Sequence, residues 1–466
     1  MILERPAMSL EKQLKKRLRI GLLFLGRERK GYDPLWGEEI RDAILGFVER
    51  SSNHEWIVPG RSQNTVMEVV LALEQMKARK VEVLVVSQPT MSDGRFAPII
   101  ARTWQEPLVL WATPEKQTGD MISANSLVGS HVYGATLAQM GRTFEFVYGH
   151  PDDLSTEEQL NRSFAVLYAV RTSRRCTVGL IGGYAPGFID FEAHVDVLSK
   201  NLGVELYQET TLQFLDFFRS ISEDRIEAAK QSILNRQIMP GIINDEHLVT
   251  TARYYAAFQD WMIKHGIAAL AIQCWPDHPA ITGYWPYAAL SLLATDGVAV
   301  AEEGDVDGAL AATFAEAAGI GPVYLSDWLE HDQDSFVCWH TGVIPLQLCV
   351  QAPSDGAPTF AYHFNNKKPL VIEGTLREDM EVTVFRLWRS HDGYHMTAFE
   401  GTTEKPKRRL LGTNQLIRAK KIDVAEWFLT MIRLGMPHHV SIIEGNHIEI
   451  LERICYHLGI AWHLQV

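Results

Sequence analysis

The first third of the sequence alternates short apolar runs with amphipathic segments of helical length, which restricts the chain to a layered α/β fold. The apolar runs have no polar alternation, as expected of parallel strands that are buried on both faces. Strands are predicted at 19–25, 56–58, 81–87, 107–112 and 144–148, and helices at 36–50, 65–78 and 152–170. This order predicts a doubly wound domain followed by a connecting helix.

The rhythm restarts near residue 177 and changes near residue 335 to segments with a period of two, which is typical of antiparallel strands. Further strands are predicted at 177–182, 204–207, 267–272, 298–301, 322–325, 360–364, 370–373, 381–387 and 395–400, with helices at 423–433 and 448–458. We therefore predict two doubly wound parallel-sheet domains followed by a C-terminal antiparallel β-barrel-like domain. The predicted boundaries are 1–172 for the N-terminal α/β domain, 173–334 for the central one and 335–466 for the β-rich one.

Composition narrows the class of protein. A chain of 466 residues is too long for one hydrophobic core, and its formal charge of −13 argues against nucleic acid or an anionic membrane as a partner. Five cysteines without CxxC spacing predict reduced thiols. The N-terminal residues have no apolar signal region, and no run approaches the length of a membrane span. We predict a soluble, cytoplasmic protein.

Two carboxylates at predicted strand ends are the main indication of chemistry. Glu303 follows the strand at 298–301, and Asp327 follows the strand at 322–325, with a predicted helix at 307–318 between them. Parallel strands joined by a helix point their carboxyl ends the same way, so both acids are expected at the edge where open α/β sheets bind ligands. The neighbouring Asp305 is interpreted as part of an acidic helix N-terminus.

Histidines near these strands are candidate metal ligands. His340 follows another apolar run, and His438 and His439 precede a predicted strand. Adjacent residues of a strand point to opposite faces, so at most one of His438 and His439 is expected in a given site. Two carboxylates with one or two imidazoles suit Mn²⁺, with Co²⁺ or Mg²⁺ as alternatives.

Two aromatic segments lie near the carboxylates in sequence. Gln273 and Trp275 belong to the segment QCWP, and Trp285 belongs to YWPY. Aromatic faces pack on the C–H surfaces of sugars while polar neighbours bind hydroxyls, so a sugar-binding wall is one interpretation and core packing is the other. The candidate substrate-binding residues are Gln273, Trp275, Trp285 and His438.

These motifs resemble the L-fucose isomerase/L-arabinose isomerase superfamily, and in particular its fucose-isomerase-like group. The resemblance rests on QCWP, EGDVDGAL from Glu303, LSD ending at Asp327, WHTGVIP around His340 and PHHVSIIEG around His439. It implies aldose–ketose isomerisation with a bound divalent metal and assembly as a trimer or hexamer of identical chains. It also implies that Glu303, Asp327 and His439, which is preferred to His438, bind the metal, with His340 as a further ligand. The chain departs from the family pattern at Glu302, where many members have cysteine.

The chemistry implied is transfer of a proton between C2 and C1 of a sugar through a cis-enediol, with Glu303 and Asp327 as metal ligands that also carry the proton. Two other functions remain open. One is a sugar-binding protein without catalysis. The other is an isomerase for an anionic sugar, a 6-sulfo or phosphorylated hexose such as sulfoquinovose, suggested by the basic run at 405–409.

Overall fold

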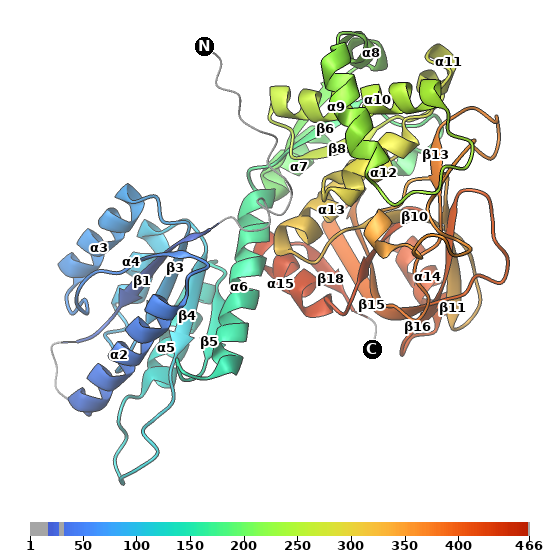
Figure 1. Cartoon of the computed structure of the whole chain (residues 1–466). Coiled ribbons are helices and arrows are strands. Elements are labelled where there is room, and N and C mark those ends of the chain that lie inside the picture. Colours follow the sequence, from blue (N-terminus) through green and yellow to red (C-terminus); the bar gives the residue numbers. More distant parts are fainter. Residues whose placement is uncertain (1–16, 28–31, 465–466) are drawn as a thin grey trace. The chain divides into compact units, whose positions relative to one another are not determined.

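The computed structural model describes residues 17–27 and 32–464 (Figure 1). The chain divides into two compact units, 1–171 and 172–466. The predicted lack of a secretory signal concerns an N-terminal stretch of which residues 1–16 lie outside the described residues. Among the helices of the described part, none is long and apolar enough to cross a membrane.

The first unit contains a five-stranded parallel sheet of order β2-β1-β3-β4-β5. Alternate residues of its strands enter two separate cores, one on each face, and this double burial explains the continuous apolar runs. The strands and helices are β1 (Arg19–Phe24), α2 (Pro34–Arg50), β2 (Glu55–Ile57), α3 (Val66–Ala78), β3 (Val83–Ser87), α4 (Phe96–Thr103), β4 (Leu108–Ala112), α5 (Ser126–Gln139), β5 (Glu145–Tyr148) and α6 (Leu154–Ser173).

The second unit begins with a four-stranded parallel sheet of order β7-β6-β8-β9. Its elements are β6 (Thr177–Ile181), α7 (Val195–Leu202), β7 (Glu205–Glu209), α8 (Thr211–Arg219), α9 (Glu223–Leu234), α10 (Asp245–His265), β8 (Ala269–Ile272), α11 (Asp277–Ile281), α12 (Tyr287–Thr295), β9 (Ala299–Ala301) and α13 (Val306–Ala318). Helix α13 contacts both β8 and β9 of this sheet and β14 and β17 of the sheet that follows.

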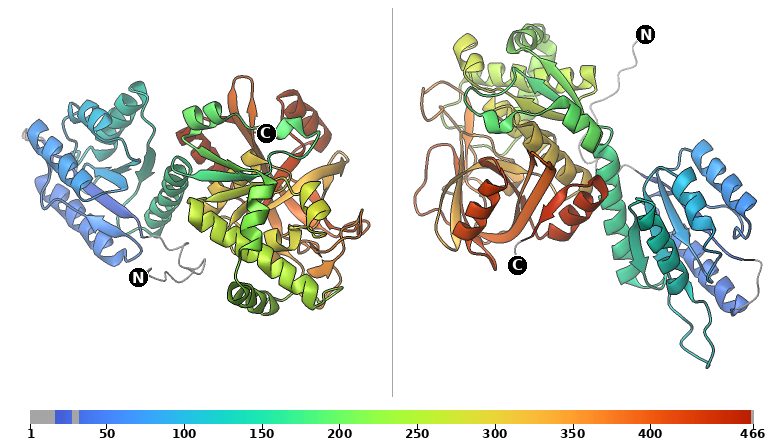
Figure 2. Two further views of the ribbon diagram at one scale, coloured as in Figure 1. Left: turned by 90° about the horizontal axis from the view of Figure 1, so that it is seen from above. Right: turned by 180° about the vertical axis from the view of Figure 1, so that it is seen from behind.

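The remaining strands form a closed ring of order β14-β17-β10-β11-β16-β15, because β14 also pairs with β15. Its pairs are antiparallel, and only β18 joins β15 in parallel. In both views of Figure 2 this orange and red ring lies beside the parallel sheet of the same unit. The elements are β10 (Tyr324–His331), β11 (Ser335–His340), β12 (Thr359–Ala361), β13 (Val371–Glu373), β14 (Glu381–Ser390), β15 (Gly393–Glu404), β16 (Thr413–Ala419), α14 (Val424–Arg433), β17 (His439–Glu444), α15 (Ile448–Leu458) and β18 (Ala461–His463). The predicted fold class is confirmed.

One predicted strand belongs to a different sheet. The segment 322–325 was expected to extend the central parallel sheet, but β10 lies in the ring and pairs antiparallel with β11 and β17. A short apolar run gives no information about its pairing partner, which explains the error. The central sheet and the ring share one hydrophobic core, so the boundary at residue 334 remains a prediction.

Candidate metal centre

A tight turn after β9 presents the first carboxylate. Glu303 has φ +63° and Gly304 has φ +84°, so both occupy the left-handed region, which costs a non-glycine residue about 1–3 kcal/mol. A side chain at position 304 would meet the Gly183 carbonyl oxygen at 2.4 Å. The Ala185 amide donates to the Glu303 carbonyl at 2.9 Å. These constraints fix the Glu303 side chain at the carboxyl edge of the parallel sheet.

The ring supplies the other side chains. Asp327 on β10 lies directly opposite His439 on β17 in the antiparallel register, an arrangement that brings Cβ atoms to about 5 Å. His340 is the last residue of β11, which pairs with β10 on its other side. The site therefore joins one edge of the parallel sheet to three neighbouring strands of the ring.

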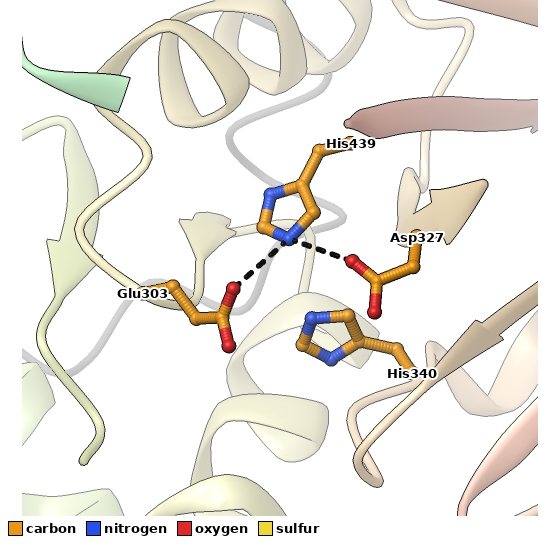
Figure 3. A group of neighbouring side chains, drawn as sticks. All are labelled: Glu303, Asp327, His340 and His439. Atoms are coloured by element: carbon orange, nitrogen blue, oxygen red, sulfur yellow. Dashed lines mark ion pairs between the residues drawn. The ribbon is translucent and has the colours of Figure 1, made fainter. Parts of the chain in front are cut away.

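Four side chains converge here and form what we call the four-residue group. One ligand atom from each lies within 4.8 Å of the others; the members are Glu303, Asp327, His340 and His439 (Figure 3). His439 Nε2 lies 3.4 Å from both Glu303 Oε2 and Asp327 Oδ1. His340 and His439 are fully buried, whereas the Asp327 side chain is 27% exposed. Asp327 is therefore the member through which a substrate can approach.

The donor atoms fit a divalent cation. Asp327 Oδ1, His340 Nε2 and His439 Nε2 are buried and have no hydrogen-bond partner. Unpartnered buried polar atoms are costly, so several that point to one place indicate a binding site. Two carboxylates and two imidazoles match the ligand preference of Mn²⁺ and similar ions. The group could therefore hold a metal, whose identity the residues do not fix.

The carboxylates and imidazoles of the site shift one another's pKa values. Burial acts to raise the pKa of Glu303, but the His438 and His439 imidazoles outweigh it and hold that pKa well below its ordinary value. The pKa of Asp327 is lowered in the same way, against burial, chiefly by His439. Burial acts to lower the pKa of His439, but Asp305, Asp327 and Glu303 together raise it well above its ordinary value. The carboxylates are thus ionised and available as ligands.

His438 also reaches the group. Its Nε2 lies 3.8 Å from both Glu303 Oε2 and Asp327 Oδ1, although only one of the two adjacent histidines was expected to enter the site. Strand β17 begins at His439, so His438 lies before the strand and is not bound by its alternation. Asp190 holds the ring through a 2.8 Å contact with Nδ1.

The segment that carries Asp190 follows β6 and packs against this part of the site. The Phe188 ring meets Trp275 edge-on, and Phe191 lies against both His438 and His439 at centroid distances of 4.5 and 4.4 Å. Phe188, Asp190 and Phe191 were not predicted to be functional. No sequence signal distinguishes Asp190 from other surface acids.

The predicted substrate-binding residues of the parallel sheet separate into two groups. Trp275 Nε1 donates to Glu303 Oε1 at 2.9 Å, and Gln273 Nε2 donates to the Tyr184 carbonyl at 2.8 Å, so both lie at the turn. Trp285 instead is buried with its Nε1 donating to Asn366 and its ring stacked on His363. The structure brings Trp275 into contact with the four-residue group and holds Trp285 in the core.

Asp305 does more than the predicted helix N-terminus requires. Its Oδ1 accepts from the Gly308 amide at 2.8 Å and caps α13, as expected. Its Oδ2 also lies 3.0 Å from His439 Nδ1, and both its oxygens pair with Arg386 of β14. The Arg386 position gave no signal in sequence because strand β14 reads as an ordinary buried strand.

Comparison with known proteins shows similarity to one kind of enzyme. The chain is 27% identical over 441 residues to a protein named sulfoquinovose isomerase from Priestia aryabhattai, covering 90% of this chain and 95% of that protein. It is 26% identical over 378 residues to another sulfoquinovose isomerase, from Alkalicoccus urumqiensis, covering 78% of this chain and 82% of that one. No model of a known protein family matches the chain.

Solved structures add no further argument. A periplasmic solute-binding protein of an ABC transporter from Actinobacillus succinogenes 130z, with bound D-allose, aligns with 65% of this chain and 90% of its own at 13% identity, with a TM-score of only 0.17. The similarity to isomerases, in contrast, extends over 90% of the chain. The prediction of an enzyme is confirmed: the chain is an intramolecular oxidoreductase of the aldose–ketose isomerase type.

Proposed function

We propose that this chain isomerises a 6-sulfo aldose of the sulfoquinovose type with a divalent metal bound by the four-residue group. The observation that carries the proposal is the convergence of four ligand atoms within 4.8 Å, three of them buried without a hydrogen-bond partner. The anionic sugar was the alternative in the sequence analysis. The relatives named for sulfoquinovose now favour it over a neutral sugar.

The residues suit the reaction. Isomerising an aldose moves a hydrogen between C2 and C1, and in this proposal Glu303 and Asp327 take and return the proton through a cis-enediol. A divalent cation held there would polarise the sugar carbonyl and the neighbouring hydroxyl. His438, whose Nε2 has no hydrogen-bond partner and whose side chain is 34% exposed, is placed to bind a sugar hydroxyl, with Trp275 beside it.

The substrate is tested with a panel of sugars. Purified protein with Mn²⁺ would be incubated with sulfoquinovose, glucose and glucose 6-phosphate, and ketose formation followed by ¹H NMR. We expect the 6-sulfo ketose to form fastest. Equal or faster turnover of glucose would reject the anionic substrate while leaving the isomerase intact.

The proton path is tested in D₂O. Transfer through a cis-enediol lets solvent deuterium enter the transferred position, so we expect deuterium at C1 of the ketose. Full retention of substrate hydrogen would instead indicate a hydride shift. As a control for exchange before turnover, the starting sugar that remains in the mixture is recovered and its deuterium content is measured.

The metal is proposed to be Mn²⁺, with Co²⁺ or Mg²⁺ as alternatives. Both carboxylate oxygens and imidazole nitrogens are present, a mixture that Mn²⁺ accepts more readily than Mg²⁺ does. Treatment with a chelator should abolish activity, and each ion added back singly should rank them. Undiminished activity after complete metal removal, verified by elemental analysis, would contradict a metal-dependent reaction.

The basic run gives little support for sulfonate binding. Lys407 pairs with Asp332 at 3.6 Å and Arg409 pairs with Asp355, so each of these two cations already has an acidic partner. Among the described residues Arg408 has no such partner. Arg408→Ala should raise KM for sulfoquinovose more than KM for any neutral sugar if this run binds the sulfonate; equal changes would exclude the run.

The proposal includes a homo-oligomer, a trimer or a hexamer, in the cytoplasm. The exposed apolar side chains on helix α5, at Leu127, Val128 and Val132, support the oligomer. The five buried cysteines, which form no disulfides, support the cytoplasmic location. Light scattering should give three or six times the 52.6 kDa of one chain. A mass of one chain at assay concentration would reject the oligomer.

A further inference from the structure

The turn after β9 carries three acids that diverge. Glu302, Glu303 and Asp305 are separated by a left-handed backbone at positions 303 and 304, so their side chains leave the turn in different directions. Each is buried: their exposed fractions are 1%, 6% and 0%. Glu303 enters the four-residue group, which leaves two buried carboxylates beside it to explain.

Asp305 orients the His439 ring. The arginine-paired carboxylate is ionised and can only accept hydrogen bonds, so the His439 Nδ1 that lies 3.0 Å away must carry the hydrogen. This fixes the orientation of the ring and leaves Nε2 facing Glu303 and Asp327 at 3.4 Å. A carboxylate behind the distal nitrogen of a metal-binding imidazole is a general device for holding such rings.

Glu302 lies in a comparable place beside the second imidazole, at a longer distance. Its Oε1 lies 3.3 Å from His340 Nδ1, and both side chains are 1% exposed. Neither Glu302 oxygen has a hydrogen-bond partner, and His340 Nε2, which faces the group in Figure 3, has none either. The Thr341 hydroxyl also lies 3.2 Å from Nδ1, but a hydroxyl can donate or accept and does not fix the tautomer.

Stability does not account for Glu302. Burying a carboxylate costs several kcal/mol unless strong partners compensate, and an apolar side chain of similar volume is often neutral or better. Asp305 has Arg386 as such a partner, whereas the ionic neighbour of Glu302 is the His340 imidazole. The contact of Glu302 with His340 is therefore the feature that can explain why this carboxylate is buried.

We propose that Glu302 is a positioning residue that holds His340 by Nδ1, so that Nε2 joins Glu303, Asp327 and His439 around the metal. Together with Asp305 it gives each of the two imidazoles its own carboxylate, both supplied by one turn. This inference rests on the proposed metal site. It assigns no contact with the substrate to Glu302.

The test compares three variants by calorimetric titration of Mn²⁺ into the metal-free protein. Glu302→Met has no acceptor for Nδ1 and should bind Mn²⁺ about 10- to 100-fold more weakly. Glu302→Gln keeps an amide oxygen that can still accept, so it should fall between wild type and Glu302→Met. Glu316→Met is the matched control, since this half-buried glutamate lies about three helical turns further along α13, and its affinity should equal that of wild type.

A spectroscopic measurement separates positioning from loss of structure. With Co²⁺ in place of Mn²⁺, the visible absorption bands report the ligand set, and those of Glu302→Met should match those of His340→Ala. The double variant should bind no more weakly than His340→Ala alone, because both changes remove the same interaction. Melting of the metal-free Glu302→Met protein should stay at or above the wild-type temperature.

The outcomes are distinguishable. Wild-type affinity and wild-type Co²⁺ spectrum in Glu302→Met would overturn the positioning role and leave the metal site intact. Absence of Mn²⁺ and Co²⁺ binding by the wild-type protein would instead remove the proposed function on which the inference rests. A lower melting temperature in the metal-free variant, with unchanged affinity, would assign Glu302 a structural role.

Discussion

The two parallel sheets of this protein have similar construction and different edges. Both are built from strands joined by helices, and both expose the carboxyl ends of their strands along one edge. At that edge of the first sheet, β3 ends in Ser87 and β4 is followed by Thr113. At the same edge of the second sheet, β9 is followed by Glu302 and Glu303. Among the described residues, the acids of the second edge form a group with imidazoles from the ring.

The difference teaches that a sheet edge alone does not make this site. Glu303 comes from the parallel sheet, while Asp327, His340 and His439 come from β10, β11 and β17. The sheet edge offers backbone turns that can expose a carboxylate, and the ring offers side chains whose positions are fixed by strand register. The following predictions test how strongly function and stability depend on that junction.

The largest effect is expected from Glu303→Gln. It removes the charge of a proposed metal ligand and one of the two proposed proton carriers, so kcat/KM should fall by about 10³- to 10⁴-fold. Steady-state kinetics with saturating Mn²⁺ would measure it. The control is Ser87→Ala at the end of β3, where the buried hydroxyl has no hydrogen-bond partner, and its kinetics should stay within twofold of wild type. A loss as large in Ser87→Ala would abolish the contrast between the edges.

The second prediction concerns the buried pair behind His439. Asp305→Asn leaves the Arg386 guanidinium, which is 1% exposed, without its counter-charge, and should lower the free energy of unfolding by about 3–5 kcal/mol. Urea denaturation would measure it. Adding Arg386→Met removes the orphaned charge and should recover part of the loss. If the single variant were as stable as wild type, the pair would not stabilise the junction.

The third prediction compares two tryptophans that the sequence treated alike. Trp275→Phe loses the 2.9 Å hydrogen bond to Glu303 Oε1, and a hydrogen bond to a charged group is worth about 1.5–3 kcal/mol, or roughly 10- to 100-fold in kcat/KM. Trp285→Phe loses the hydrogen bond from the buried indole to the exposed Asn366 and should leave kcat/KM within twofold. A larger loss of kcat/KM in Trp285→Phe than in Trp275→Phe would mean that Trp285, and not Trp275, binds the substrate.

The fold class could be predicted because the signals of buried strands and amphipathic helices are local, whereas the members of the four-residue group were proposed as metal ligands from the family resemblance. Apolar runs predict buried strands, and Glu303 and His340 were placed correctly at strand ends by the residues beside them. The sheet to which β10 belongs could not be predicted, since pairing depends on residues such as Val440 and Cys338 that are distant in sequence. The expectation that at most one of His438 and His439 would enter the site failed because His438 lies before β17, where the alternation of a strand does not apply.

The contacts behind the histidines of the site were missed for the same physical reason. Asp190 lies 248 positions from His438, and Asp305 lies 81 positions from Arg386. Each pairing depends on how the ring closes against the parallel sheet, which no local pattern encodes. In the sequence, Asp190 resembles any surface acid, Asp305 resembles a helix cap, and Arg386 resembles an ordinary arginine of a strand.

The smallest effect is expected in the first unit, away from both edges. Thr65 forms a capping box with Glu68 at the start of α3, and Thr65→Ala should lower the free energy of unfolding by about 1 kcal/mol. The matched variant in the second unit is Asp423→Ala, which removes the cap of α14 and should cost a similar amount. Denaturation curves and kinetics on both proteins measure the result, and neither variant should change kcat by more than twofold. A selective fall of kcat in Thr65→Ala would mean that the first unit takes part in catalysis, because both variants remove a side-chain acceptor from a helix N-terminus but in different units.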